Sequence, residues 1–121
     1  MFTISVETHF KASHQLTLTD GSKEPLHSHD WLVIADVCSN KLNRMGLVMD
    51  FGRLKTAING VTADLEKAPL ESIDYFRENS SSAEAIAKYI YERLEPELPA
   101  GITLEAVRVF EEPGCSAKFT R

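Results

Sequence analysis

The sequence predicts an α+β fold in which two helices cover one face of a four-stranded antiparallel sheet. Three observations support this prediction. Apolar residues alternate with polar ones near the N-terminus, two central segments repeat apolar residues with helical spacing, and a Pro-Gly turn separates two strand-like segments near the C-terminus. At 121 residues the chain has the length of one domain, which we place at residues 1–121. The predicted order of elements is strand, strand, helix, helix, strand, strand (ββααββ).

The first two strands are predicted to pair as an antiparallel hairpin with a long loop. From Phe2 to Ala12, apolar residues fall mainly on every second position, which is the pattern of a half-buried strand. A polar, turn-forming stretch at residues 19–22 leads into the second strand, Leu26–Cys38. All four residues of its run Leu32–Ala35 are apolar, so both faces of the strand are apolar there, as in a central strand.

The two helices are predicted from capping residues and apolar spacing. Asp50 can cap the first helix, whose apolar residues recur at three- and four-residue steps from Phe51 to Leu65. The second helix follows a polar segment, and Ser81 and Glu84 have the spacing of a capping box. Its apolar stripe consists of Ile86, Ile90 and Leu94.

The last two strands are predicted on either side of a turn at residues 112–114. They are Ile102–Glu111 and Cys115–Arg121. The two helices leave the opposite face of the sheet without cover in this chain. Because the strands are apolar on both parities, we expect that face to be buried in a homo-oligomer.

The composition argues against several classes of partner. With 18 acidic and 13 basic side chains, the net charge of −5 disfavours a nucleic-acid-binding surface. No apolar run approaches the ~18 residues needed to span a membrane, and Cys38 and Cys115 form neither a disulfide framework nor a zinc-finger pair. We therefore expect a cytoplasmic protein with reduced thiols, no nucleic-acid or membrane partner, and a small-molecule ligand.

The histidines suggest a metal site. His27 and His29 stand two residues apart on a predicted strand, so their side chains point to the same face. His14 has the parity of the buried residues of the first strand, and the hairpin would bring it opposite this pair. Three imidazoles with an open fourth position are a common ligand set of catalytic zinc. Such a pair alone is more often two hydrogen-bonded strand residues, and it is the third histidine that favours a metal site. We interpret His9, which has the opposite parity, as solvated.

Several motifs together resemble the 6-pyruvoyl-tetrahydropterin synthase family, which includes the bacterial 6-carboxytetrahydropterin synthases of queuosine biosynthesis. The resemblance runs over essentially the whole chain. The motifs that carry it, in order, are Phe10–His14 (FKASH), Leu26–Trp31 (LHSHDW), Gly46–Lys55 (GLVMDFGRLK), Ser82–Glu84 (SAE) and Val109–Pro113 (VFEEP). The resemblance implies the tunnelling fold (T-fold), with subunits that close into a trimeric barrel and trimers that stack into hexamers.

The resemblance also implies roles for individual residues. It implies that His14, His27 and His29 bind Zn²⁺ and that Glu111 anchors the pterin ring. A carboxylate suits that role, because the 2-amino and N3–H groups of a pterin form a donor pair that it can accept in bidentate fashion. A solvated turn residue is the alternative for Glu111. Ser82 and Glu84 match positions that contact or support the substrate, although capping also explains Glu84.

The chain departs from the family pattern at residues that move protons. The bacterial catalytic cysteine corresponds to Lys23, and the relay sequence Leu-Asp-His is replaced by Leu65–Lys67. All four histidines lie before residue 30, so no relay histidine exists. In one branch of the family a glutamate replaces the cysteine and the enzyme cleaves the side chain of dihydroneopterin, a reaction of folate biosynthesis.

Glu24 is the corresponding candidate base, since it stands three residues before His27. An exposed loop carboxylate is an equally good interpretation, because a carboxylate needs burial or a nearby metal to tune it. Lys67 is a weaker candidate proton carrier, and a surface lysine near a helix end is the commoner case.

Three functional hypotheses follow. The first is a zinc-dependent enzyme, a carbon–oxygen or carbon–carbon lyase that acts on the side chain of a reduced neopterin. The second is a non-catalytic homologue that binds zinc and a pterin or purine. The third is a structural zinc oligomer.

Overall fold

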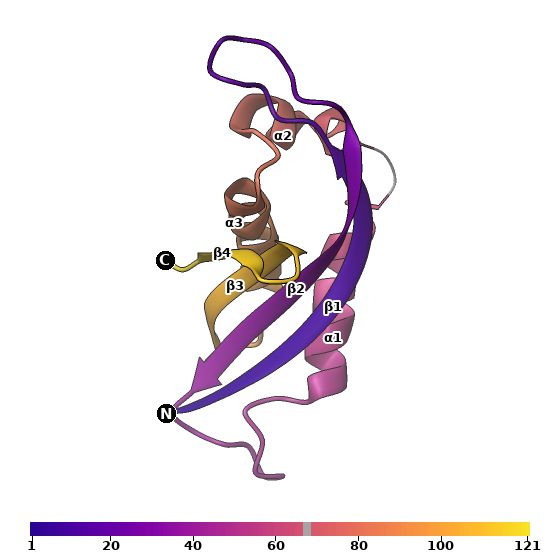
Figure 1. Ribbon diagram of the computed structural model, residues 1–121. Coiled ribbons are helices and arrows are strands. Elements are labelled where there is room, and N and C mark those ends of the chain that lie inside the picture. The colour runs from indigo at the N-terminus through magenta and orange to yellow at the C-terminus, as the bar shows by residue number, and fades with distance from the viewer. Residues whose placement is uncertain (67–68) are drawn as a thin grey trace.

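A four-stranded antiparallel sheet with strand order β1-β2-β3-β4 forms the framework of the protein (Figure 1). The computed structural model describes residues 1–66 and 69–121. The strands are β1 (Phe2–His14), β2 (His27–Ser39), β3 (Thr103–Glu112) and β4 (Cys115–Phe119). Each strand pairs antiparallel with the next one in the chain. The predicted fold class and the predicted hairpin of the first two strands are therefore confirmed.

The β1–β2 hairpin is longer than the helices that cover it. Both strands contain 13 residues, which corresponds to about 43 Å at the usual rise of a strand. Helix α1 (Phe51–Ala63) also contains 13 residues, but at the helical rise these span only about 20 Å. One end of the hairpin therefore extends past α1 and meets the segment around the short helix α2 (Asp74–Asn79) (Figure 1).

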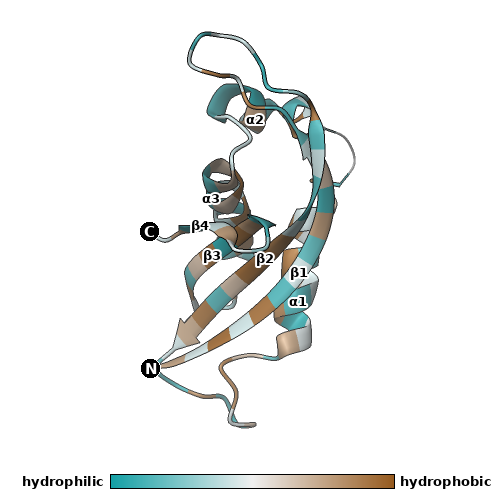
Figure 2. Cartoon of the chain, in the orientation of Figure 1, coloured by the Kyte–Doolittle hydropathy of each residue, from teal (hydrophilic) through white to brown (hydrophobic). Residues whose placement is uncertain are grey.

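The core lies between the sheet and the two longer helices, α1 and α3 (Ala83–Leu94). Apolar and polar residues alternate along β1 (Figure 2), and the apolar parity faces the helices because burying it removes apolar surface from water. Most of the fully buried side chains of the core come from β2, α1, α3 and β3, and include Val33, Ala35, Leu54, Ile58, Ile86, Ile90 and Val109.

The opposite face of the sheet carries mostly polar side chains on β1, such as Glu7 and Lys11. It also carries partly buried Leu32 and Ile34 of β2. The expectation that another subunit covers this face stays a prediction.

Both predicted helices exist, but the cap of the second is shifted by one residue. The Asp50 carboxylate accepts a hydrogen bond from the Arg53 N–H at 2.9 Å, which confirms it as the N-cap of α1. The N-cap of α3 is Ser82, whose Oγ accepts from the Ala85 N–H at 3.1 Å. The predicted capping box of Ser81 and Glu84 is therefore wrong: Ser81 is buried before the helix, and its carbonyl has another partner.

Two further details of the helices differ from the sequence prediction. Helix α1 ends at Ala63, although Leu65 beyond its end is fully buried. Phe51, which was expected to join the apolar stripe, is 58% exposed because it lies in the first turn, at the edge of the core.

The short helix α2 and two 3-10 turns, η1 (Leu70–Ser72) and η2 (Glu95–Glu97), were not predicted. Each is too short to show a helical repeat in the sequence. At the C-cap of α2, Ser80 has φ 70° and ψ 164°, a backbone conformation that normally requires glycine. No helix in the described parts of the chain is long and apolar enough to cross a membrane.

Candidate metal centre

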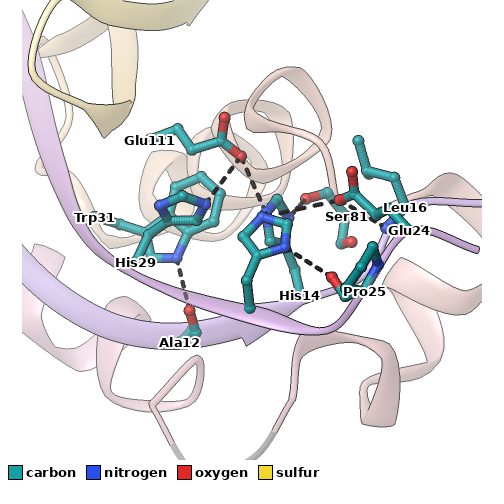
Figure 3. Close-up of polar contacts among 10 residues, drawn as sticks. Ala12, His14, Leu16, Glu24, Pro25, His29, Trp31, Ser81 and Glu111 are labelled. Atoms are coloured by element: carbon teal, nitrogen blue, oxygen red, sulfur yellow. Dashed lines mark hydrogen bonds and ion pairs between the residues drawn. The ribbon is translucent and has the colours of Figure 1, made fainter.

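His14, His27, His29 and Glu111 come together at the end of the β1–β2 hairpin that extends past α1 (Figure 3). Each offers one ligand atom, and all of these atoms lie within 4.8 Å of one another. They come from three strands that are neighbours in the sheet. The structure thus brings together the three histidines predicted from the sequence and adds the Glu111 carboxylate to them.

The register of the hairpin places the histidines. His14 pairs with His27, and Ala12 pairs with His29. Because directly opposed residues of an antiparallel pair project to the same face, His14 lies beside His27 and diagonally across from His29. The predicted pairing geometry is confirmed. His9 lies exposed on the other face, with its Nδ1 3.7 Å from Asp30 Oδ2.

A bulge in β3 positions Glu111. The register between β3 and β4 shifts between Phe110 and Glu112, and such a bulge redirects the side chain at that point. Glu111 Oε1 lies 3.0 Å from His14 Nε2 and 3.6 Å from His29 Nε2 (Figure 3). In this structure Glu111 is therefore directed at the histidines.

Backbone carbonyls determine which ring nitrogen of two histidines faces the cluster. His14 Nδ1 lies 2.9 Å from the Ser81 carbonyl oxygen, and His27 Nδ1 lies 2.9 Å from the Pro25 carbonyl oxygen. A carbonyl can only accept, so in each neutral ring Nδ1 carries the proton and Nε2 carries a lone pair. The same arrangement orients metal-ligating histidines in known metalloproteins.

The resulting lone pairs converge without a donor between them. His14 Nε2 and His27 Nε2 are 2.9 Å apart, so two acceptors face each other, and the Glu111 oxygen is a third acceptor at the same point. His29 Nε2 is buried and lacks a hydrogen-bond partner in the described chain, since 3.6 Å to Glu111 is too long for one. A cation removes all of these unfavourable contacts at once. Three neutral imidazoles with one carboxylate fit Zn²⁺.

Trp31 forms the floor beneath the histidines. Its side chain is fully buried, and its indole N–H donates to the Ala12 carbonyl at 3.1 Å. The ring stands edge-on to His14 and His29, with centroid distances of 4.9 and 5.3 Å. His14 itself is only 1% exposed. This apolar floor excludes water from one side of the cluster and limits rotation of two of its rings.

Glu24 lies beside the cluster. Its Oε1 accepts a hydrogen bond from the Leu16 N–H at 3.1 Å and lies 3.9 Å from His27 Nε2 (Figure 3). The Glu24 N–H in turn donates to the Leu16 carbonyl at 3.0 Å. Its side chain is 27% exposed. Glu24 is therefore held at the edge of the site rather than free in the loop, and one carboxylate oxygen is left without a hydrogen bond from Leu16.

The two cysteines are not part of the described cluster. Cys38 pairs with Thr3 at the other end of the hairpin and is buried. Cys115 is exposed at the start of β4. Loss of hydration, together with a hydrogen bond to Glu112, raises the pKa of its thiol, so little thiolate is present near neutral pH.

The other predicted site residues are placed as follows. Ser82 caps α3 and Glu84 is exposed in the first turn of that helix, so the structure does not bring them into the cluster. Lys67 lies outside the described residues. Sequence reasoning missed the carbonyls of Ser81 and Pro25, because a main-chain carbonyl carries no sequence signal.

Known proteins resemble this chain over nearly its whole length. Residues 3–121 match the model of the 6-pyruvoyl tetrahydropterin synthase family. The chain is 32% identical over 130 residues to a 6-carboxy-5,6,7,8-tetrahydropterin synthase of Synechocystis, covering 98% of this chain and 93% of that protein. It is 29% identical over 102 residues to a dihydroneopterin monophosphate aldolase of Pyrococcus furiosus, covering 84% and 82%.

Solved structures named as 6-pyruvoyl tetrahydropterin synthases share the fold of this chain. The structure of Caenorhabditis elegans 6-pyruvoyl tetrahydropterin synthase superimposes with a TM-score of 0.84 at 19% identity, covering 99% of this chain and 95% of that one. The match of residues 3–121 and the Synechocystis relative together show the family. The chain belongs to the 6-pyruvoyl tetrahydropterin synthase family.

Proposed function

We propose that the protein is a zinc-dependent lyase that acts on the side chain of a reduced neopterin derivative. The observation that carries the metal part is the convergence of the His14, His27 and His29 nitrogens and a Glu111 oxygen within 4.8 Å. Family membership and the names of the relatives, a carboxytetrahydropterin synthase and a dihydroneopterin monophosphate aldolase, support a pterin substrate.

In this proposal His14, His27 and His29 hold the zinc. Bound zinc would polarise side-chain oxygens of the substrate and make the neighbouring C–H and O–H groups more acidic. In the neutral rings, the carbonyls of Ser81 and Pro25 place the proton on Nδ1 and orient Nε2 toward the proposed metal, through the contacts described above. The Trp31 floor keeps water away from one side of the reacting groups.

Glu24 is the proposed general base. A base must lie within reach of the proton that it takes. The position of Glu24 supports this role, because its carboxylate lies 3.9 Å from a proposed zinc ligand, His27. The hydrogen bond from Leu16 occupies Oε1, which leaves Oε2 to accept a proton. The aldolase relative supports a carbon–carbon cleavage started by such proton removal.

Glu111, Ser82 and Glu84 remain proposed substrate contacts. Glu111 now stands at the fourth position of the cluster, so a substrate oxygen would have to displace it. The displaced carboxylate would then be free to accept hydrogen bonds from the ligand.

A non-catalytic homologue that binds zinc and a pterin or purine is the second candidate. The observation that favours it is the absence of any histidine after His29, together with Glu66 and Lys67 at the place of the relay pair. Incubation of the zinc-loaded protein with dihydroneopterin, its monophosphate and its triphosphate, followed by mass spectrometry, separates the two. A new product supports the enzyme, whereas binding without any product supports the homologue.

Assembly into a trimer or a dimer of trimers, a cytoplasmic location, and a place in queuosine or folate biosynthesis are proposals from the same family relationship. Size-exclusion chromatography with light scattering tests the first of these.

A further inference from the structure

We propose that Lys23 is a positioning residue: its ion pair with Glu71 closes the β1–β2 loop over a cavity beside the histidine cluster, and this closure fixes the position of Glu24. The loop comprises residues 15–26. The cavity has a volume of about 500 Å³ and lies between this loop and the segment from η1 to Ser81. The inference rests on the proposed function, because it takes Glu24 as the general base.

Glu71 lacks a partner in the wall of this cavity. Both of its carboxylate oxygens are shielded from water, and neither has a hydrogen-bond partner in the described part of the chain. The hydroxyl of Ser81, a residue that also lines the cavity and is only 1% exposed, is unpaired as well. Buried polar groups in proteins are nearly always paired, and an unpaired carboxylate is especially costly. This wall therefore favours the approach of a cation.

Two cationic side chains line the same cavity, and Lys23 is the one that is free to move to Glu71. Arg77 forms an ion pair with Asp74. Lys23 is exposed on the loop side of the cavity and forms no ion pair within residues 1–66 and 69–121. Its stem is flexible, and its ammonium group acts as a point charge that can approach a carboxylate from many directions. Lys23 can therefore complete Glu71 from within the chain.

The loop that carries Lys23 is a small hairpin of its own, so it can move as one unit. Thr17 and Lys23 pair in an isolated antiparallel bridge. Next to this bridge, the Glu24 N–H donates to the Leu16 carbonyl at 3.0 Å, and residues 18–22 close the turn through their own backbone hydrogen bonds. The loop projects past the end of the sheet, on the side of α2 (Figure 1). Closure over the cavity leaves these internal hydrogen bonds intact.

Closure at Lys23 also moves Glu24. The two residues are adjacent on one arm of the loop, and neighbouring residues of an extended arm point to opposite faces. Lys23 lines the cavity, whereas Glu24 Oε1 lies 3.9 Å from His27 Nε2. Glu24 is tied to Leu16 through both its main chain and its side chain, so it shifts together with the loop. The ion pair therefore determines how the proposed base stands relative to the proposed zinc site.

Hydrogen exchange followed by mass spectrometry tests the ion pair independently of turnover. The zinc-loaded wild type is compared with Lys23→Met, Glu71→Gln and the double variant. We expect the amides of residues 16–24 to exchange on the order of 5-fold faster in each single variant, because the open loop is more populated. The double variant should exchange no faster than the single variants, because all three lose the same ion pair. Unchanged exchange in either single variant, or additive effects in the double variant, would overturn the inference.

Matched variants separate the ion pair from general changes of charge or fold. Lys23→Arg keeps a cation and should keep the wild-type exchange, whereas exchange as fast as in Lys23→Met would overturn the inference. Glu78→Gln on α2 and Lys88→Met on α3 change exposed positions and should not alter the loop. The amides of β3 should exchange as in the wild type. Faster exchange of β3 in Glu71→Gln would show that this carboxylate supports the whole fold, against the inference.

Turnover of a reduced neopterin tests the positioning of Glu24. Lys23→Met should lower kcat on the order of 10- to 100-fold, with KM and zinc content little changed, because the base is misplaced while the zinc ligands stay. Lys23→Arg should restore kcat. If Lys23→Met keeps the wild-type kcat while Glu24→Gln loses it, the positioning role fails and the lyase proposal stands. If the exchange results hold but the wild type converts no neopterin, the ion pair stands and the lyase proposal fails.

Discussion

Replacement of Glu24 by glutamine is the most direct test of the proposed chemistry. Glutamine has the same shape and keeps a carbonyl oxygen for the Leu16 N–H, which now donates to Glu24 Oε1 at 3.1 Å. It cannot take up a proton. The substitution therefore removes the base while leaving the loop beside His27 in place.

The expected magnitudes follow from these contacts. A positioned general base contributes about 10² to 10⁴ in rate, so turnover of a reduced neopterin should fall by that factor. The change from a charged to a neutral acceptor should cost about 1 kcal/mol or less of stability, because the side chain is partly exposed. Zinc content should stay the same, since Glu24 is not one of the clustered ligand residues.

The assay is a single-turnover measurement with zinc-loaded protein, in which product formation is followed by mass. Glu7→Gln, an exposed acid of β1, is the matched control and should behave as wild type. If Glu24→Gln converts substrate at the wild-type rate, Glu24 is not the base and the argument from its position beside His27 is refuted.

Three further predictions test the site and the fold. His27→Ala should lose most bound zinc in elemental analysis whereas His9→Ala should retain it, and equal zinc contents would contradict the three-histidine site. Ser80→Gly should raise the free energy of unfolding in urea by about 1 kcal/mol, because glycine relieves the strain at φ 70°; a decrease would show that the serine side chain matters more. Cys115 should react with iodoacetamide more slowly than a free thiol at pH 8, because its raised pKa reduces the thiolate fraction, and labelling at the free-thiol rate would argue against this.

The strands were predictable because their signal is local. The alternation that begins at Phe2 and the apolar run around Leu32 gave both strands of the hairpin to within one or two residues. The period of two also fixed the face to which His27 and His29 point. The Asp50 cap was predictable for the same reason, since a capping side chain bonds only to the next turn of its own helix.

The capping box at Ser81 failed because a distant contact overrides the local pattern. The Ser81 carbonyl accepts from His14, which is 67 positions away in the chain, and the helix begins one residue later. Helix α2 was also unpredictable, because its six residues are too few to show a helical repeat.

The sequence by itself determined the fold class and the three histidines of the proposed zinc site, because strand periodicity and hairpin pairing decide which side chains share a face. Only the tertiary structure decided the remaining members of the site. Glu111 reaches the cluster through a bulge in a strand far along the chain, and Glu24 is held by Leu16 across a loop. Each depends on a contact that crosses a loop or joins two strands, and the packing and hydrogen bonds of the complete fold set these contacts rather than any local pattern.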